Sequence, residues 1–252
     1  MDSKAPVTQL LLTASFKPSV GTLTILQFAD LYRVFEESLP QFAQIAPAAA
    51  MSYLPGVAPE AQLSGSPRVQ FASADGSRFV LFQEDRFSYG WHRQSPLDED
   101  PNYPGFDTVL QDAEANWRFV RKWIKETFDL EVVPDVLEIA YADAFETHDS
   151  KGEPIPLAET FTFLNSVGTR MLSFEYKWME PLADPLENGF ASVTVQGPAL
   201  TVYGRSVTTM ASTASFKAGP SWEDIGAQFD RVHANMNEVF QRLVKQPFDT
   251  KL

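Results

Sequence analysis

Cysteine is absent from this 252-residue chain, and histidine occurs only three times, as His92, His148 and His233. Without cysteine the chain has no disulfides, thiolate zinc sites, iron–sulfur clusters or cysteine nucleophiles. No apolar run approaches the ~18 residues that a membrane-spanning helix needs. Polar residues interrupt the apolar N-terminal stretch from Val7 to Phe16, which is typical of a strand rather than of a signal peptide. We therefore expect a cytoplasmic protein that has no membrane partner.

Basic residues are scarce as well: 20 Lys and Arg stand against 33 Asp and Glu, which gives a formal net charge of −13. Contacts to nucleic-acid phosphates need clustered Lys and Arg, and the longest basic run here is Arg121-Lys122. Direct binding of nucleic acid is therefore not expected. The acidic charge has two interpretations: it keeps the protein soluble, or it docks on a basic partner or mimics nucleic acid.

The motifs of common cofactor and catalytic sites are missing too. The sequence contains no GxSxG nucleophile turn, no GxxxxGK[ST] phosphate loop, no GxGxxG dinucleotide turn and no HExxH zinc helix. We expect no cofactor, no metal ion and no complete catalytic arrangement.

The periodicity of apolar residues predicts an α+β protein, with antiparallel sheets backed by long amphipathic helices. In the first half we expect a strand over Val7–Phe16 and a hairpin that turns at Ala74–Ser77. Two helices are expected over about 25–39 and 108–128. Their apolar stripes are Ile25, Phe28, Tyr32, Phe35 and Leu39, and Val109, Ala113, Trp117, Val120, Ile124 and Phe128.

The second half repeats this order of elements. A short helix is expected behind Pro156 and a long final helix behind a cap at Ser221. The turn between the last two strands is expected at Gly197-Pro198. The strands are Val136–Phe145, 172–178, Phe190–Gln196 and Leu200–Lys217.

Each half thus reads strand, helix, three strands, helix, which suggests a tandem duplication. The expected halves are residues 1–132 and 133–252. They share one continuous sheet, or they form two lobes with a cleft between them.

The segment from Phe82 to Phe106 stands out, because it combines aromatic residues, both signs of charge and three prolines. A mixture of this kind suits a binding surface. The candidate binding residues are Arg86, Tyr89, Trp91, His92, Arg93, Asp98, Asp100 and Tyr103.

Each feature of this segment also has a structural interpretation. His92 is a general base oriented by Asp98 or Asp100, or it lies at the rim of a loop. The acidic run Asp98–Asp100 is a set of oxygen ligands, or it is a solvated turn. The alternating aromatics Phe87, Tyr89 and Trp91, with Trp117 and Trp123, form a ligand groove, or they are a sheet face packed against the second helix.

A second acidic group with a histidine comprises Glu138, Asp143, Glu146, His148 and Asp149. On an extended strand Glu138 and Asp143 point to opposite faces, so they are not expected to converge as a carboxylate pair. A metal or hydrolase site at this group is the less favoured interpretation.

The sequence resembles a bacterial family of about 250 residues that is sporadically distributed and has no known activity. The resemblance covers most of the chain in order, and it lies in four places: Ser38-Leu39-Pro40-Gln41-Phe42; Arg86-Phe87-Ser88-Tyr89-Gly90-Trp91 with the following Asp98–Pro104; Leu137–Asp143; and a closing helix with His233 and Phe240. The chain departs from the family pattern at Ala142 and in its C-terminal tail. The patchy distribution implies an accessory bacterial system, such as a mobile element or antiviral defence.

These observations predict a non-enzymatic protein that binds another protein, which is expected to be basic, or that associates with itself. The alternative is a sensor of a small molecule or nucleotide, which is held in a cleft between the two halves. A hydrolase of unknown type, with His92 as its candidate base, is the third hypothesis.

Overall fold

The structure is a computed structural model, and it describes residues 6–48, 51, 67–95, 102–148, 153, 155–164, 174–182, 189–202 and 205–245. Its elements in chain order are β1 (Val7–Lys17), α1 (Ile25–Phe35), β2 (Gln41–Ile45), β3 (Arg68–Ala72), β4 (Arg78–Gln83), β5 (Arg86–His92), α2 (Phe106–Phe128), β6 (Val133–Glu146), α3 (Leu157–Thr160), β7 (Phe174–Pro181), β8 (Gly189–Val202), β9 (Arg205–Lys217) and α4 (Ile225–Leu243). Short 3-10 helices lie at Thr162–Leu164 and Trp222–Asp224.

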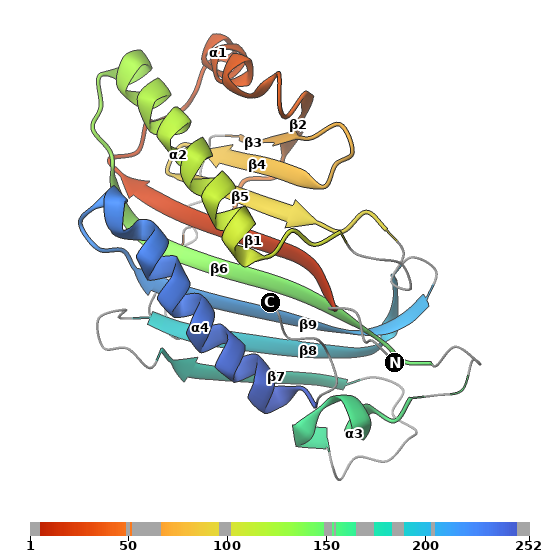
Figure 1. The fold of residues 1–252 in the computed structure, drawn as a ribbon. Coiled ribbons are helices and arrows are strands. Elements are labelled where there is room, and N and C mark those ends of the chain that lie inside the picture. Colours follow the sequence, from red (N-terminus) through yellow and green to blue (C-terminus); the bar gives the residue numbers. More distant parts are fainter. Residues whose placement is uncertain are drawn as a thin grey trace.

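The strands form one sheet in the order β2-β3-β4-β5-β1-β6-β9-β8-β7 (Figure 1). All neighbouring pairs are antiparallel. The expected α+β class with antiparallel strands is therefore confirmed. The first and sixth strands pair directly, so that Leu12 lies opposite Ile139. Of the two expected arrangements, the described strands thus adopt the continuous sheet.

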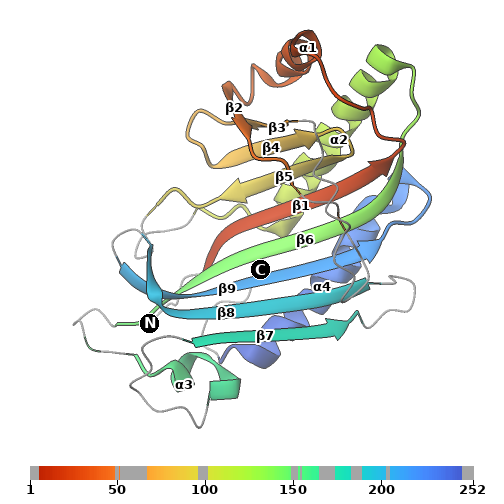
Figure 2. The ribbon, with the colours of Figure 1, turned by 180° about the vertical axis from the view of Figure 1, so that it is seen from behind.

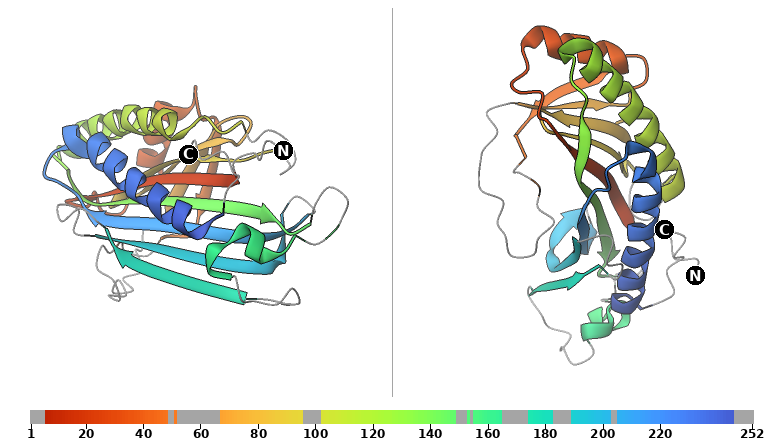
Figure 3. Two further views of the ribbon diagram at one scale, coloured as in Figure 1. Left: turned by 60° about the horizontal axis from the view of Figure 1, so that its bottom comes forward. Right: turned by 90° about the vertical axis from the view of Figure 1, so that its left-hand side faces the viewer.

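Helices α2 and α4 both cover the same face of this sheet (Figures 1 and 3). We call it the helix face. Viewed from behind, the sheet lies in front of both helices (Figure 2). We call this side the second face. None of the helices in the described ranges is both long enough and apolar enough to cross a membrane.

The helix face holds the main core, and the aromatic strand β5 packs there against α2. Phe87, Tyr89 and Trp91 are all at most 3% exposed. The rings of Phe87 and Trp117 are 4.3 Å apart. Trp123 is buried as well, with its ring edge-on to Phe82. These aromatic residues are therefore core, and they do not form an open groove.

The second half differs from the expected strand pattern at Gly197-Pro198. Strand β8 runs through this dipeptide instead of turning there. Its register with β9 shifts between Gln196 and Leu200. An irregularity of this kind accommodates a proline, which cannot donate a ladder hydrogen bond. The two residues after β8, 203–204, lie outside the described part of the chain.

Helix α1 begins with a capping box at Thr24. The Thr24 hydroxyl accepts a hydrogen bond from the Gln27 backbone N–H, and the Gln27 side chain accepts one from the Thr24 backbone N–H. The helix buries Leu31 and Phe35, whereas Ile25 is 83% exposed. The expected apolar stripe therefore begins one turn later than predicted, because Ile25 lies in the first turn beyond the edge of the core.

Candidate functional site

Strand alternation divides the candidate binding residues between the two faces of β5. Tyr89 and Trp91 point into the core on the helix face, and Arg86 and His92 belong to the second face. Arg93 follows the strand and is only 1% exposed. Asp98 and Asp100 lie outside the described residues. The predicted residues thus do not form one continuous surface.

On the helix face, Tyr89 joins a small polar network at the edge of the core. Its hydroxyl donates to Asp112 Oδ2 at 3.0 Å, and Arg78 Nη1 is 3.4 Å from the same oxygen. Burial raises the pKa of Tyr89, and the nearby Asp112 carboxylate adds to this effect. Tyr89 is therefore a neutral donor that fixes Asp112, and Asp112 in turn holds Arg78.

Trp91 and His92 reach a polar pocket of about 550 Å³ at the end of strands β3, β4 and β5. The β3–β4 turn forms one wall, with Asp75 and Arg78, and the segment before α2 forms another, with Asn102. We call this cavity the turn pocket. Tyr103 packs against Trp91, and the centres of the two rings are 5.1 Å apart.

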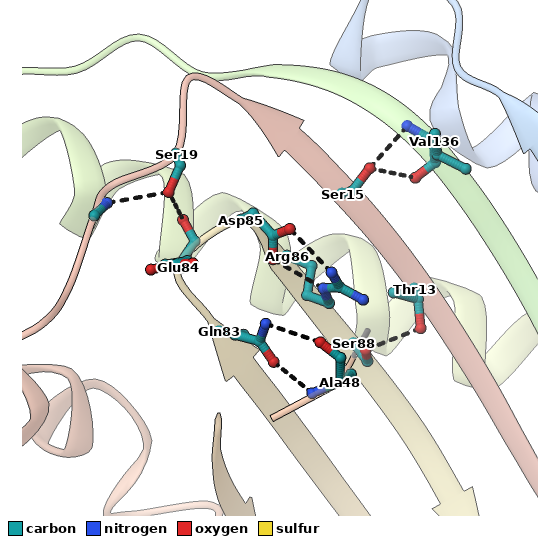
Figure 4. Close-up of polar contacts among 11 residues, drawn as sticks. Thr13, Ser15, Ser19, Ala48, Gln83, Glu84, Asp85, Arg86, Ser88 and Val136 are labelled. Carbon is teal, nitrogen blue, oxygen red and sulfur yellow. Dashed lines mark hydrogen bonds and ion pairs between the residues drawn. The ribbon is translucent and has the colours of Figure 1, made fainter. Parts of the chain in front are cut away.

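On the second face, buried polar side chains lie along the neighbouring strands β1, β4 and β5 (Figure 4). We call them, with the charged side chains described next, the buried polar band. The Thr13 hydroxyl donates to Ser88 Oγ at 2.9 Å across the β1–β5 pair. The Gln83 side chain exchanges hydrogen bonds with the backbone of Ala48. Ser88 and Gln83 are fully buried. These amide and hydroxyl groups of the band thus have partners, as burial requires.

Three charged side chains belong to the same band. Arg86 donates from Nε and Nη2 to the Asp85 carboxylate, each at 2.9 Å. Glu138 on β6 accepts a hydrogen bond from Ser215 at 2.9 Å, and burial raises its pKa despite the nearby Arg86 and Arg68. Arg68 Nε is buried with no hydrogen-bond partner. Burial and the like charge of Arg86 lower the pKa of Arg68.

A second buried polar group lies on the helix face between α2 and α4. The Tyr141 hydroxyl is 2.9 Å from Nδ1 of His233, and the ring of His233 stacks on Phe106 at 3.8 Å. Asp143 is 2% exposed, and its Oδ1 has no partner. Burial raises the pKa of Asp143 to about 7. The Tyr103 hydroxyl is buried beside that of Tyr141, and burial raises the pKa of both hydroxyls.

The acidic group of the second half does not assemble around a shared point. Glu138 and Asp143 lie on opposite faces of β6, as their five-residue separation predicted. His148 is exposed, and Asp149 is outside the described residues. Across the described ranges, no three His, Asp or Glu side chains are close enough to share a metal ion.

Exposed apolar residues concentrate at one edge of the sheet. Seven large apolar side chains in the described part of the chain are exposed, and four of them belong to α1 and β2. We call these four the apolar edge: Ile25, Leu26, Val34 and Phe42. Phe42 is 51% exposed, and its ring contacts Tyr32 and Phe71.

Neither the apolar edge nor most of the turn pocket was among the predicted residues. The sequence does carry a signal for the edge, because Leu26 and Val34 fall outside the apolar stripe of their helix. No local signal identifies the pocket, since it joins a turn, a strand end and a loop that are separated in sequence.

No protein-family model matches the sequence, and no curated protein matches it either. One solved structure with some similarity is a rolling circle replication initiator protein from Geobacillus stearothermophilus. It is 10% identical, and the comparison covers 98% of this chain and 90% of that chain, with a TM-score of 0.28. A score this low carries no argument about fold or function.

Proposed function

We propose that this chain is a non-enzymatic protein-binding component that takes up an extended segment of another protein at the apolar edge. The observation that carries this proposal is an unprotected edge strand beside exposed apolar side chains. Among the described strands, β2 pairs only with β3, so that its outer backbone groups have no strand partner. Such an edge is a template for strand addition.

The opposite edge of the sheet provides an internal comparison. Edge strand β7 carries Glu175, Lys177 and Glu180 and ends at Pro181. Charged residues and proline are the usual protection against pairing with another chain. Strand β2, with the sequence QFAQI, contains neither. The two edges therefore differ in the feature that permits strand addition.

The charges near the apolar edge indicate the chemistry of the partner. Residues 24–45 contain Asp30, Glu36 and Glu37 but only one basic residue, Arg33. The whole chain has a net charge of −13, and two copies would repel each other. The partner that fits is a different protein whose binding segment has alternate apolar residues and basic flanks. The link to an accessory bacterial system stays a prediction.

Site-specific photo-crosslinking in the native host tests this proposal. A crosslinking amino acid replaces Phe42 in one variant and Phe119 in the control, since Phe119 on α2 is similarly exposed at 55%. We expect an adduct specific to position 42. The adduct partner, once purified, should bind the wild type and Phe119→Lys equally, and Phe42→Lys at least about tenfold more weakly.

Two results would overturn the proposal. One is equal labelling at positions 42 and 119. The other is a purified adduct partner that binds Phe42→Lys as tightly as it binds the wild type. An adduct with a second copy of the chain would replace the basic partner with self-association, and size-exclusion chromatography with light scattering would show the dimer.

We also propose that the two halves arose by tandem duplication. Outward from the centre of the sheet, β1 is followed by β5, β4 and β3, and β6 is followed by β9, β8 and β7. In each half a shorter helix follows the central strand, and a long helix follows the last strand. A circular permutant that begins at Val133 should fold with an unchanged near-ultraviolet circular dichroism spectrum, and failure of several linker lengths to fold would count against the proposal.

A further inference from the structure

The turn between β3 and β4 fixes the direction of the backbone groups on β3. The Ser73 N–H donates to the Arg78 carbonyl at 2.9 Å, so these two residues form a hydrogen-bonded pair. In an antiparallel ladder such pairs alternate with pairs that are not hydrogen-bonded, and the N–H and C=O of one residue point to the same side. The backbone of Phe71 therefore bonds to β4, and its neighbours Gln70 and Ala72 direct their backbone groups to β2.

The outer side of β2, at the edge of the sheet (Figure 1), thus presents the backbone of two residues. Ala43 lies opposite Gln70, so its N–H and C=O are used in the ladder with β3. The backbone groups of its neighbours Phe42 and Gln44 point the other way, to the open edge. Both residues are exposed. This edge therefore offers two N–H donors and two C=O acceptors to an added strand.

Side-chain alternation places one aromatic ring beside these groups. Phe42 lies opposite Phe71, which belongs to the main core, and its ring centre is 6.3 Å from that of Tyr32 on α1. Ile25 precedes Tyr32 by two helical turns and lies on the same side of α1. A large apolar side chain on an added strand, level with Phe42, would cover the exposed part of that ring.

The charge beside the edge is concentrated at one end of β2. Asp30 is paired with Arg33, with Oδ1 and Nη1 2.7 Å apart. Glu36 and Glu37 are exposed, and they lie in the connection from α1 to the first residue of β2, Gln41. A basic residue of a partner would be attracted to this end of the strand.

We infer, on the basis of the proposed function, that the partner segment is an extended strand that bonds to the N–H and C=O groups of Phe42 and Gln44. It places a large apolar side chain beside Phe42, and it carries Lys or Arg near Gln41. The segment is therefore recognised through its backbone and through these two side chains, and it has no proline at the positions that pair with β2.

The opposite edge of the sheet supplies a matched control. The Leu182 N–H donates to the Gly189 carbonyl at 3.1 Å, so the even-numbered residues of β7 bond to β8. The outward backbone groups of β7 then belong to the odd-numbered residues, and Lys177 is one of them. Its amide should not respond to a strand that is added at β2.

Amide hydrogen exchange of the full chain, followed by NMR, tests the inference. The probe is a synthetic peptide, Lys-Lys-Val-Thr-Phe-Thr-Val-Lys-Lys, which has alternate apolar residues and basic flanks. In the free protein, we expect the amides of Phe42 and Gln44 to exchange faster than that of Ala43. Saturating peptide should slow exchange at Phe42 and Gln44 by at least about tenfold and leave Lys177 unchanged.

Two variants at one position separate the backbone from the side chain. Gln44→Pro removes the outward N–H but no ladder bond to β3, and Gln44→Ala keeps that N–H. By fluorescence anisotropy, Gln44→Ala should bind the peptide within about twofold of the wild type, and Gln44→Pro at least about tenfold more weakly. Peptides with Ser in place of Phe, or Glu in place of Lys, should each bind the wild type at least about tenfold more weakly.

Four results would overturn the inference. They are slow exchange of Phe42 and Gln44 in the free protein, peptide binding that leaves both amides unprotected, equal binding to folded Gln44→Pro and Gln44→Ala, and no binding of the peptide at concentrations up to about 1 mM. None of these results removes a specific crosslinked adduct at position 42. Such an adduct would then indicate a partner that docks through side chains alone.

Discussion

Nδ1 of His233 on α4 lies 2.9 Å from the hydroxyl oxygen of Tyr141 on β6. The other ring nitrogen, Nε2, is 3.1 Å from the side-chain nitrogen of Asn237, which donates to it. Nε2 therefore accepts, and the proton of the neutral ring is on Nδ1, directed at Tyr141. This contact joins the sheet to α4 across 92 residues of sequence.

Replacing Tyr141 with phenylalanine removes this hydrogen bond without changing the packing of the ring. Tyr141 is almost fully buried, with 6% of its surface exposed. We expect the free energy of unfolding to fall by about 1–3 kcal/mol, the usual cost of leaving a buried donor unmatched. Urea denaturation measures this change.

Tyr32→Phe is the matched control. Its hydroxyl donates to the Pro40 carbonyl at 3.1 Å near the surface, and water can replace that bond. This variant should stay within about 0.5 kcal/mol of the wild type. If both variants lose the same free energy of unfolding, the buried hydrogen bond between Tyr141 and His233 contributes no more to stability than the exposed one of Tyr32.

Asp143 makes stability depend on pH. Its pKa is about 7 in the folded protein, against an ordinary value of 3.8, because burial disfavours the charged carboxylate. Between pH 4 and 7 the folded state holds a proton that the unfolded state has released, so this group's contribution to stability falls as the pH rises through that range. Above pH 7 the loss is complete. At about 1.4 kcal/mol per pKa unit this loss amounts to at most about 4–5 kcal/mol.

Asp143→Asn removes the charged form. We expect this variant to match the wild type near pH 4 and to be more stable by up to a few kcal/mol at pH 8. Chemical denaturation at several pH values measures the difference. Asp230→Asn, at an exposed position on α4, controls for the loss of one negative charge. A difference between Asp143→Asn and the wild type that is constant with pH would contradict the raised pKa.

Local patterns were sufficient to predict the contact between β5 and α2. The alternation of Phe87, Tyr89 and Trp91 and the helical spacing around Trp117 each identify an apolar face, and two such faces in consecutive elements bury each other. The same alternation places Arg86 and Ser88 on the second face. Counting along the strand is therefore enough to separate Arg86 from the aromatic residues.

Contacts between distant segments could not be predicted in this way. Arg86 and Glu138 approach each other because β1 lies between β5 and β6. No local sequence pattern predicts this order of strands. The opposite orientation of Glu138 and Asp143 followed from their spacing, but the burial of Asp143 depends on tertiary packing that no local pattern shows. The path of β8 through Gly197-Pro198 was missed because a Gly-Pro pair is typical of a turn.

Gly90 is required by close packing rather than by backbone conformation. A Cβ atom at this position would lie 2.6 Å from Phe79 Cζ and 2.8 Å from the Leu10 carbonyl oxygen. Real Cβ contacts essentially never come so close, and β1 and β5 would have to move apart. We expect Gly90→Ala to lower the free energy of unfolding by about 1–3 kcal/mol.

Thermal and urea denaturation of Gly90→Ala measure this loss. The double variant Gly90→Ala with Phe79→Leu removes one of the two close contacts. It should therefore be less destabilised than the sum of the two single changes. Purely additive effects would show that the sheet relaxes at the Leu10 carbonyl instead.

Arg68 and Arg86 differ in their partners, although both guanidinium groups belong to the buried polar band. Arg86 is bonded through two nitrogens to Asp85, whereas the buried Nε of Arg68 has no partner. A buried polar atom without a hydrogen-bond partner opposes folding, and replacing the side chain that carries it with an apolar one of similar length is often neutral or stabilising. Removing one member of a hydrogen-bonded ion pair instead leaves the other uncompensated.

We therefore expect Arg68→Met to change the free energy of unfolding by no more than about 1 kcal/mol, and Arg86→Met to lower it by about 2–4 kcal/mol. The loss of Arg68 also takes a positive charge away from Glu138, whose pKa is already raised by burial, and this limits any gain in stability from removing the unpartnered Nε. Urea denaturation at pH 7 compares the two variants with Arg118→Met, an exposed control on α2 whose side chain is 75% exposed. If Arg68→Met loses as much stability as Arg86→Met, the attraction between Arg68 and Glu138 outweighs the cost of burying the unpartnered Nε.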